Sequence, residues 1–252
     1  MNGLEMYLGA SYMCAVDIGS IRIFPPSWGD FLCGIIISQQ ENDSRERGDQ
    51  HMDVQVKSSS GITLVPVETR LMADRNIFIE SEINSESACE FVKKVMYLNG
   101  ESTVKPINVL INSNGGEINA GMLMYDVIQA SKAPIRMFCV GHAYSMGAVL
   151  FACGNHGRYM LPHGELMIHE PLLGNRVGGN SSSIKSISDS LLESKRKMNQ
   201  ILAKHTGKTE EEVEEATSFD HYLTPEESVE FGLCDEIVGF DRVIASDQTI
   251  SG

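Results

Sequence analysis

The segment Gly141–Gly154, GHAYSMGAVLFACG, places one hydroxyl group at the start of an apolar run. Ser145 stands between Tyr144 and Met146, and the residues after it are apolar enough to form a short buried helix. Two interpretations of this serine are open. It is either an N-cap, a position at which serine is common, or a nucleophile held against a buried helix.

The surrounding segments predict strands that alternate with helices. IRMFCVG and INVLIN are apolar runs of strand length, and the second leads into an Asn-Gly-Gly turn that tolerates positive φ. SESACEFVKKVMYLN and INAGMLMYDVIQASK have helical spacing, whereas RNIFIESEI and ELMIHEP resemble strands. This alternation is typical of an α/β domain with a largely parallel sheet.

The C-terminal half predicts helices with clear ends. An amphipathic pattern runs from about residue 184 to 205. Capping boxes begin at Thr209 and Thr224, and Gly232 is a suitable helix stop. Directly after His169, the segment LLGNRVGGNSSS is rich in glycine and serine and predicts a mobile loop.

The composition favours a globular protein that does not bind polyanions. The 252 residues are 42% hydrophobic and 21% charged, which is enough for a substantial core. The formal net charge of −14 argues against nucleic acid or an anionic membrane as a partner, because both carry negative charge themselves. The sequence has neither a signal-peptide pattern nor a run of about 18 apolar residues, so we expect a cytoplasmic protein.

The cysteines and histidines do not predict a metal site. The six cysteines lie far apart without a Cys-x-x-Cys pair, a pattern typical of reduced, buried thiols. His156, His163, Cys139 and Cys153 fall in one region, but their spacing matches no common zinc pattern. We therefore expect no metal ion and no cofactor in this chain.

A serine nucleophile needs several partner groups. A histidine must take its proton, a carboxylate must orient that histidine, and two N–H groups must stabilise the oxyanion. Ser145 opens a helix, His169 ends a strand, and Gly115 and Gly116 form a turn at the end of another strand. Ala143 departs from the Gly-x-Ser-x-Gly motif of α/β-hydrolases, so these residues alone leave the N-cap interpretation open.

Four motifs together resemble the proteolytic subunit of the ATP-dependent Clp protease. They are, in order, INSNGGEINAGMLMYD, GHAYSMGAVLFACG, LPHGELMIHEP and YLTPEESVEFGLCDEI, within about Ile62–Val238. The resemblance implies an α/β, crotonase-like (ClpP-type) fold with layers of parallel sheet, a protruding helical handle over about 184–205, and ring formation. It implies a flexible or processed N-terminal extension over 1–61, a peptidase domain over 62–240 and a C-terminal tail over 241–252.

The resemblance also assigns catalytic roles to residues of this chain. The nucleophile falls on Ser145, the general base on His169 and the orienting carboxylate on Asp220. The oxyanion hole falls on the backbone N–H groups of Gly116 and Met146. Such a set hydrolyses a peptide bond through an acyl-enzyme intermediate.

The loop after the histidine is implied to lie beside the substrate as an extended edge that pairs with its backbone. Main-chain recognition of this kind tolerates many sequences, so the implied substrates are unfolded polypeptides. The substrate-binding residues are Gly115, Pro171, Leu172, Leu173 and Gly174.

The implied partners are further copies of this chain and an ATPase. Two heptameric rings would form a tetradecamer around a chamber, and a partner unfoldase of the AAA+ type would use the ATP and admit the substrate. Ser218 and Phe219 replace a family Asp-Arg pair that couples ring contacts to the catalytic residues. The positions of the aromatic ATPase-docking pocket hold Asn108, Leu110 and Ala130.

A further departure lies before TRLMADR, where we expect the usual axial loop and first helix to be shortened or absent. These departures fall on docking and regulation, while the catalytic set is complete. We therefore expect intact chemistry and weakened docking to a standard Clp ATPase.

Other functions on the same scaffold stay open. A phage-type prohead maturation protease would use the same catalytic residues, whereas a crotonase-type acyl-CoA enzyme would need only the oxyanion donors. A catalytically silent ring subunit that assembles with an active paralogue is a further alternative, motivated by Ser218 and Phe219.

Overall fold

The computed structural model describes residues 52–58, 61–174 and 178–244, and the statements below concern these residues. In chain order the elements are β1 (Asp53–Ser58), β2 (Gly61–Pro66), α2 (Val67–Ala73), β3 (Asn76–Ile79), α3 (Ser85–Glu101), β4 (Ile107–Ser113), α4 (Ile118–Ala130), β5 (Ile135–Tyr144), α5 (Met146–Ala152), β6 (Arg158–Met160), β7 (Glu165–Ile168), α6 (Ser181–Thr206), α7 (Glu210–Ala216), β8 (His221–Leu223), α8 (Pro225–Phe231), β9 (Glu236–Ile237) and α9 (Phe240–Ile244).

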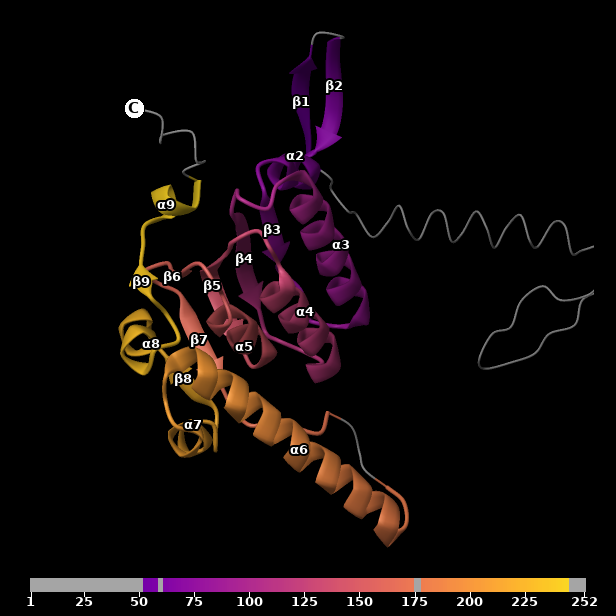
Figure 1. Cartoon of the computed structure of the whole chain (residues 1–252), viewed down its shortest axis with the longest axis vertical. Coiled ribbons are helices and arrows are strands. Elements are labelled where there is room, and N and C mark those ends of the chain that lie inside the picture. Colours follow the sequence, from indigo (N-terminus) through magenta and orange to yellow (C-terminus); the bar gives the residue numbers. More distant parts are fainter. Residues whose placement is uncertain (1–51, 59–60, 175–177, 245–252) are drawn as a thin grey trace, which may run out of the picture. The chain divides into compact units, whose positions relative to one another are not determined.

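A seven-stranded sheet forms the centre of the domain (Figure 1). β3, β4, β5, β6 and β9 pair in that order and are parallel. β7 is parallel to the end of β5, and β8 is antiparallel to β7. Parallel neighbours need crossover connections, which α3, α4 and α5 supply. The predicted α/β alternation and parallel sheet are confirmed.

The core lies where α3, α4 and α5 pack against the sheet. On α3 the buried residues are Ala88, Phe91, Val95 and Leu98, which recur every three or four positions along one face. α5 is buried along its whole length, which explains why its sequence is apolar on all sides. Because α5 is enclosed, the residue that precedes it is held by packing on several sides.

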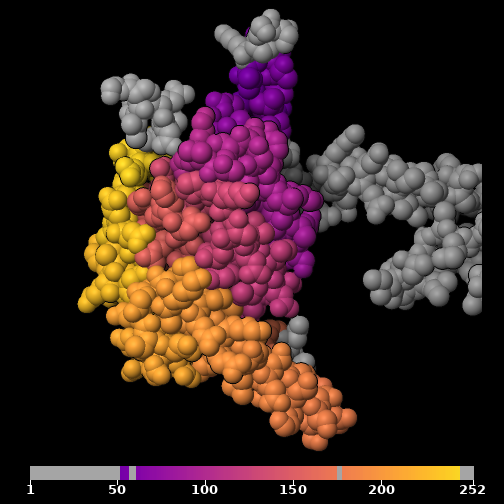
Figure 2. Space-filling view, in the orientation of Figure 1, coloured from indigo at the N-terminus to yellow at the C-terminus, as the bar shows by residue number. Residues whose placement is uncertain are grey.

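The predicted helix ends are confirmed. Capping boxes form at Thr209 and Thr224, and Gly232 ends α8 with a φ of 93°. α6 begins after Asn180, ends before Gly207, and extends past the neighbouring elements as the predicted handle (Figures 1 and 2). Among the helices described, none is long and apolar enough to cross a membrane.

The N-terminal border of the domain differs from the prediction. β1 lies inside the segment 1–61 that we expected to be flexible or processed. Its burial alternates, with Val54 and Val56 half-buried and Asp53 and Gln55 exposed, as is typical of a strand. The first helix, which we expected to be shortened or absent before TRLMADR, is the short helix α2, which starts only two residues before Thr69, directly follows β2 and carries an Arg70–Asp74 ion pair of 2.7 Å.

Two smaller expectations also need correction. α9 crosses the expected start of a C-terminal tail at residue 241, and its Val243 is buried against Leu110 and Phe138. Cys89 is exposed rather than buried, because it lies on the outer face of α3. The other cysteines that the structure describes are buried, and Cys14 and Cys33 lie outside the described ranges.

Candidate active site

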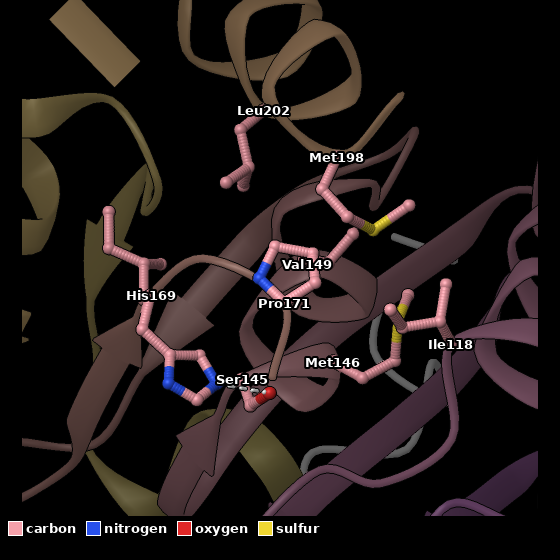
Figure 3. Close-up of a pocket in the computed structure, with 9 residues that line it drawn as sticks. Ile118, Ser145, Met146, Val149, His169, Pro171, Met198 and Leu202 are labelled. Carbon is pink, nitrogen blue, oxygen red and sulfur yellow. Dashed lines mark hydrogen bonds between the residues drawn. The ribbon is translucent and has the colours of Figure 1, made fainter. Parts of the chain in front are cut away.

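Three polar side chains meet where three neighbouring strands end or begin. Ser145 follows β5, His169 follows β7 and Asp220 precedes β8. The Ser145 Oγ lies 2.8 Å from His169 Nε2 (Figure 3), and His169 Nδ1 lies 3.0 Å from Asp220 Oδ1. A carboxylate only accepts hydrogen bonds, so this arrangement assigns the imidazole proton to Nδ1 and leaves Nε2 to accept from the serine.

The backbone of Ser145 makes a sharp turn between β5 and α5. Its φ of 51° and ψ of −120° are unusual for a residue with a side chain. The hydroxyl forms no capping hydrogen bond with α5 and instead points to His169. The backbone amide of Ser145 donates to the carbonyl oxygen of Met167 on β7, at 2.8 Å. Ser145 occupies the N-cap position without acting as a side-chain cap.

Two glycines allow the neighbouring turn to approach the serine. Gly115 and Gly116 follow β4 with φ values of 90° and 150°. A Cβ on Gly115 would lie 2.6 Å from the carbonyl oxygen of Tyr144 and 2.9 Å from the Ser145 Cβ. A Cβ on Gly116 would lie 2.2 Å from the carbonyl oxygen of Ile83. Both positions therefore require glycine for space as well as for backbone conformation.

Two amide groups in the turns next to the serine have no partner among the residues that the structure describes. The N–H groups of Gly116 and Met146 donate no hydrogen bond to another residue of the described ranges. The glycine turn lies against the second of them, because a Cβ on Gly115 would be 3.0 Å from the Met146 nitrogen. Unused amides in such a place are suited to an oxyanion.

The Asp220 carboxyl group lies at the surface. Its side chain is 58% exposed, and its hydrogen bond within the described ranges is the one with His169. A backbone hydrogen bond joins the segment that carries His169 to the segment that carries Asp220. The amide of Glu170 donates to the Thr217 carbonyl oxygen at 2.7 Å.

An ammonium group on α6 joins the segments that carry His169 and Asp220. Lys195 Nζ lies 2.9 Å from a carboxylate oxygen of Glu170 and 3.0 Å from one of Glu214. Hydrogen bonds to Glu170 and Glu214 raise the pKa of Lys195. Glu170 follows the histidine directly, and Glu214 lies on α7, which leads to Asp220. We did not predict this cluster, since no spacing rule joins residues so far apart in sequence.

A small apolar pocket of about 30 Å³ opens beside the serine (Figure 3). One wall comes from α5 and its surroundings, and the other comes from α6. Gly121 makes room for the Met146 side chain, because a Cβ there would lie 2.3 Å from Met146 Cγ. The pocket is lined by Ile118, Ser145, Met146, Val149, Ile168, His169, Pro171, Met198 and Leu202. The apolar stripe of the long helix was the one sequence signal for it.

The predicted substrate-binding residues divide into two groups. Gly115 and Pro171 lie at the site, the first in the glycine turn and the second in the pocket wall. Leu172, Leu173 and Gly174 are exposed and form no strand, with Leu172 69% exposed. Residues 175–177 of the same predicted loop lie outside the described ranges.

The residues that depart from the resemblance have clear positions. Asn108 Nδ2 donates to Asn76 Oδ1 at 3.1 Å, Leu110 is buried, and Ala130 is exposed at the end of α4. Phe219, next to the carboxylate, is 75% exposed. The described residues include no group of three or more His, Cys, Asp or Glu side chains that could hold a metal ion.

A family model described as Clp protease matches residues 59–241 of the chain. The chain belongs to the Clp protease family. The resemblance inferred from the four motifs is therefore confirmed, together with the crotonase-like α/β fold. As a Clp protease the chain is a ClpP-like serine peptidase. The match begins before β2, so the first helix α2 lies within the family domain.

Proposed function

We propose that this Clp protease is an endopeptidase in which Ser145 is the nucleophile, His169 the general base and Asp220 the group that orients the base. The observation that carries the proposal is the unbroken series of hydrogen bonds from Ser145 to Asp220. It lies beside the unused amides of Gly116 and Met146, which would form the oxyanion hole.

The reaction follows from these positions. Ser145 Oγ attacks the peptide carbonyl carbon while His169 Nε2 takes its proton, and the oxyanion accepts hydrogen bonds from the two amides. When the C–N bond breaks, the imidazolium returns the proton to the leaving amine. A water molecule then attacks the acyl-enzyme with the same proton transfers, which releases the acid and restores the serine.

The proposed substrate is an unfolded polypeptide. The exposed segment Leu172–Gly174, which forms no strand, and the glycine turn at Gly115 next to the serine offer backbone groups, which supports recognition through the main chain. The small apolar pocket supports binding of an apolar side chain next to the cleaved bond.

We further propose a tetradecamer of two heptameric rings around a chamber, joined through α6. Exposed Ile184 and Leu192 on that helix support contact with another copy of the chain. A cytoplasmic AAA+ ATPase would admit the substrate and use the ATP, so this chain itself would need no cofactor. The polar Asn108 and the small Ala130 at the expected docking positions support weak binding to a standard Clp ATPase.

A fluorophosphonate probe tests the proposed chemistry, because it labels activated serines. Covalent labelling of the assembled wild type should disappear in Ser145→Ala and in His169→Ala. The matched controls are Ser194→Ala at a half-buried position of α6, where the hydroxyl donates to the Ser190 carbonyl oxygen, and His156→Ala in an exposed turn, and both should retain labelling. An assembled wild type that is not labelled would contradict the proposal and favour the catalytically silent subunit.

A further inference from the structure

The strands that carry the catalytic residues present a second cluster on the sheet face away from the core. Cα partners on neighbouring strands point to the same face, and here His142 pairs with Glu165, Tyr144 with Met167, and Met167 with Tyr222. The residues that alternate with them are buried in the core: Ala143, Leu166, Ile168 and Leu223.

Tyr144 is the centre of this cluster. Its phenol donates a hydrogen bond to a carboxylate oxygen of Glu165 on β7. Its ring lies 4.6 Å from the ring of His142, centroid to centroid, and meets Tyr222 of β8 edge to face at 5.7 Å and 85°. One side chain on β5 is thus tied to both strands that border the histidine and the carboxylate.

The phenol of Tyr144 is a stable hydrogen-bond donor at neutral pH. The hydrogen bond that the phenol donates to Glu165 raises the pKa of Tyr144 to about 12, so the phenol keeps its proton at neutral pH. The contact therefore does not switch on or off near pH 7.

The position of Tyr144 in the chain gives these contacts a consequence for the serine. Tyr144 directly precedes Ser145, whose positive φ is costly and persists only where the surrounding structure fixes it. From the core side, α5 and the glycine turn hold Ser145. On the opposite face of β5, the contacts of Tyr144 hold the residue before it.

We propose that Tyr144, through Glu165 and Tyr222, is a positioning residue that keeps the Ser145 hydroxyl aligned with His169 and Asp220. The inference rests on the proposed function, because it concerns the rate at which the Ser145 hydroxyl reacts. Tyr144 touches no reacting atom, so its replacement should slow acylation without changing how the probe binds.

The test measures the rate of acylation by a fluorophosphonate probe as a function of probe concentration. Each rate is divided by the number of titratable serines, meaning the Ser145 residues that the probe labels when the reaction is complete. Tyr144→Leu should lower the maximal rate per titratable serine about 100-fold, the size expected for a misplacement of about 1 Å. Tyr144→Phe keeps the ring contacts and should lower it about fivefold, the worth of one hydrogen bond. The half-saturating probe concentration should not change.

Two control variants separate positioning from general damage. Tyr97→Phe removes a similar Tyr–Glu hydrogen bond, 2.9 Å long, to Glu101 on α3, far from the site. Tyr159→Leu removes a tyrosine on β6 that stacks on Phe138. Both should keep the wild-type rate per titratable serine. A merely structural role for Tyr144 predicts fewer titratable serines with an unchanged rate for each.

A double-variant cycle decides the matter if Tyr144→Leu does not fold. Tyr144→Phe and Glu165→Met break the same hydrogen bond, so the combined variant should be no slower than the slower single one. Additive losses would overturn the inference, as would rates for the Tyr144 variants equal to that of Tyr97→Phe. Absence of wild-type labelling at Ser145 is a different outcome, which contradicts the proposed function itself.

Discussion

The two ends of the Ser145–His169–Asp220 series are held by different forces. Packing fixes the position of Ser145, because α5 is buried and the glycine turn leaves no room for a Cβ. At Asp220 the carboxyl group is mostly exposed, and the segments around it are joined by the ion pairs of Lys195, a side chain that is itself 23% exposed.

This difference teaches which part of the site can move. The serine cannot shift without disturbing the core, whereas the carboxylate can shift by rearrangement of surface charges. Packing in the core responds little to salt, while exposed ion pairs weaken as ionic strength rises. We therefore expect the carboxylate end to be the part of the site that conditions and partners adjust.

The largest effect is expected from Asp220→Asn, which tests the exposed end of the series. An amide cannot hold the imidazole proton on Nδ1 as a carboxylate does, so the hydrolysis rate should fall about 10⁴-fold with the fold intact. The control Asp189→Asn removes an exposed carboxylate that pairs with Lys185 at 3.0 Å. Peptide hydrolysis by both variants, with circular dichroism, checks this. A loss below tenfold would mean that the exposed carboxylate does not orient the base.

Gly115→Ala tests the packed end. The new methyl group would meet Tyr144, Ser145 and the Met146 nitrogen at 3.0 Å or less, and the positive φ adds strain. Displacement of the serine should reduce the labelling rate about 100-fold. Gly100→Ala is the control, because a Cβ there meets nothing within 4 Å, and it should stabilise α3 by about 0.5–1 kcal/mol. Equal rates for both variants would contradict the steric account.

Lys195→Met sharpens the comparison at the charged end. It removes both ion pairs, and we expect a fall of about tenfold in the hydrolysis rate as His169 and Asp220 lose their alignment. The variant should also lose the salt sensitivity of the wild type. Lys185→Met, which breaks a pair within α6 only, should leave both the rate and its salt dependence unchanged. A salt dependence that persists in Lys195→Met would refute the role of the cluster.

The smallest predicted effect is a loss of stability in acid, which comes from a histidine on the inner side of α6. Burial, with help from Lys204 and Arg158, lowers the pKa of His205 to about 4. The unfolded chain binds this proton at about pH 6.5, so the free energy of unfolding should fall as pH drops from about 6.5 to 4. Because the group is half-buried, we expect a loss of about 1–2 kcal/mol.

Urea unfolding at pH 7 and pH 5 measures this loss. The pH dependence should shrink in His205→Gln and remain in His156→Gln, whose side chain is exposed. Identical pH dependence in wild type and His205→Gln would exclude this histidine as the acid-sensitive group.

The sequence alone was enough to predict the parallel sheet and the helix ends. Apolar runs such as Ile107–Asn112 and capping boxes at Thr209 and Thr224 are local signals, and local physics governs them. β1 was not predicted, because its alternation of Val54 and Val56 is short and set among polar residues. Local signals of that length do not distinguish a strand from a polar linker.

The candidate site was predictable only in part. Ser145, His169 and Asp220 came from motifs in the right order, and the structure brings them within hydrogen-bonding distance. The contacts of Lys195 and of Tyr144 depend on how α6, α7 and β8 pack together. Sequence spacing carries no information on such packing, because these contacts join residues that are distant along the chain.

The backbone at Ser145 has a consequence for folding that is separate from catalysis. Glycine adopts a positive φ far more cheaply than serine, so Ser145→Gly would give a protein that is inactive and yet more stable, by about 1 kcal/mol. Selection for stability alone would therefore remove the hydroxyl. A serine here therefore costs stability, as expected if the hydroxyl serves the proposed activity.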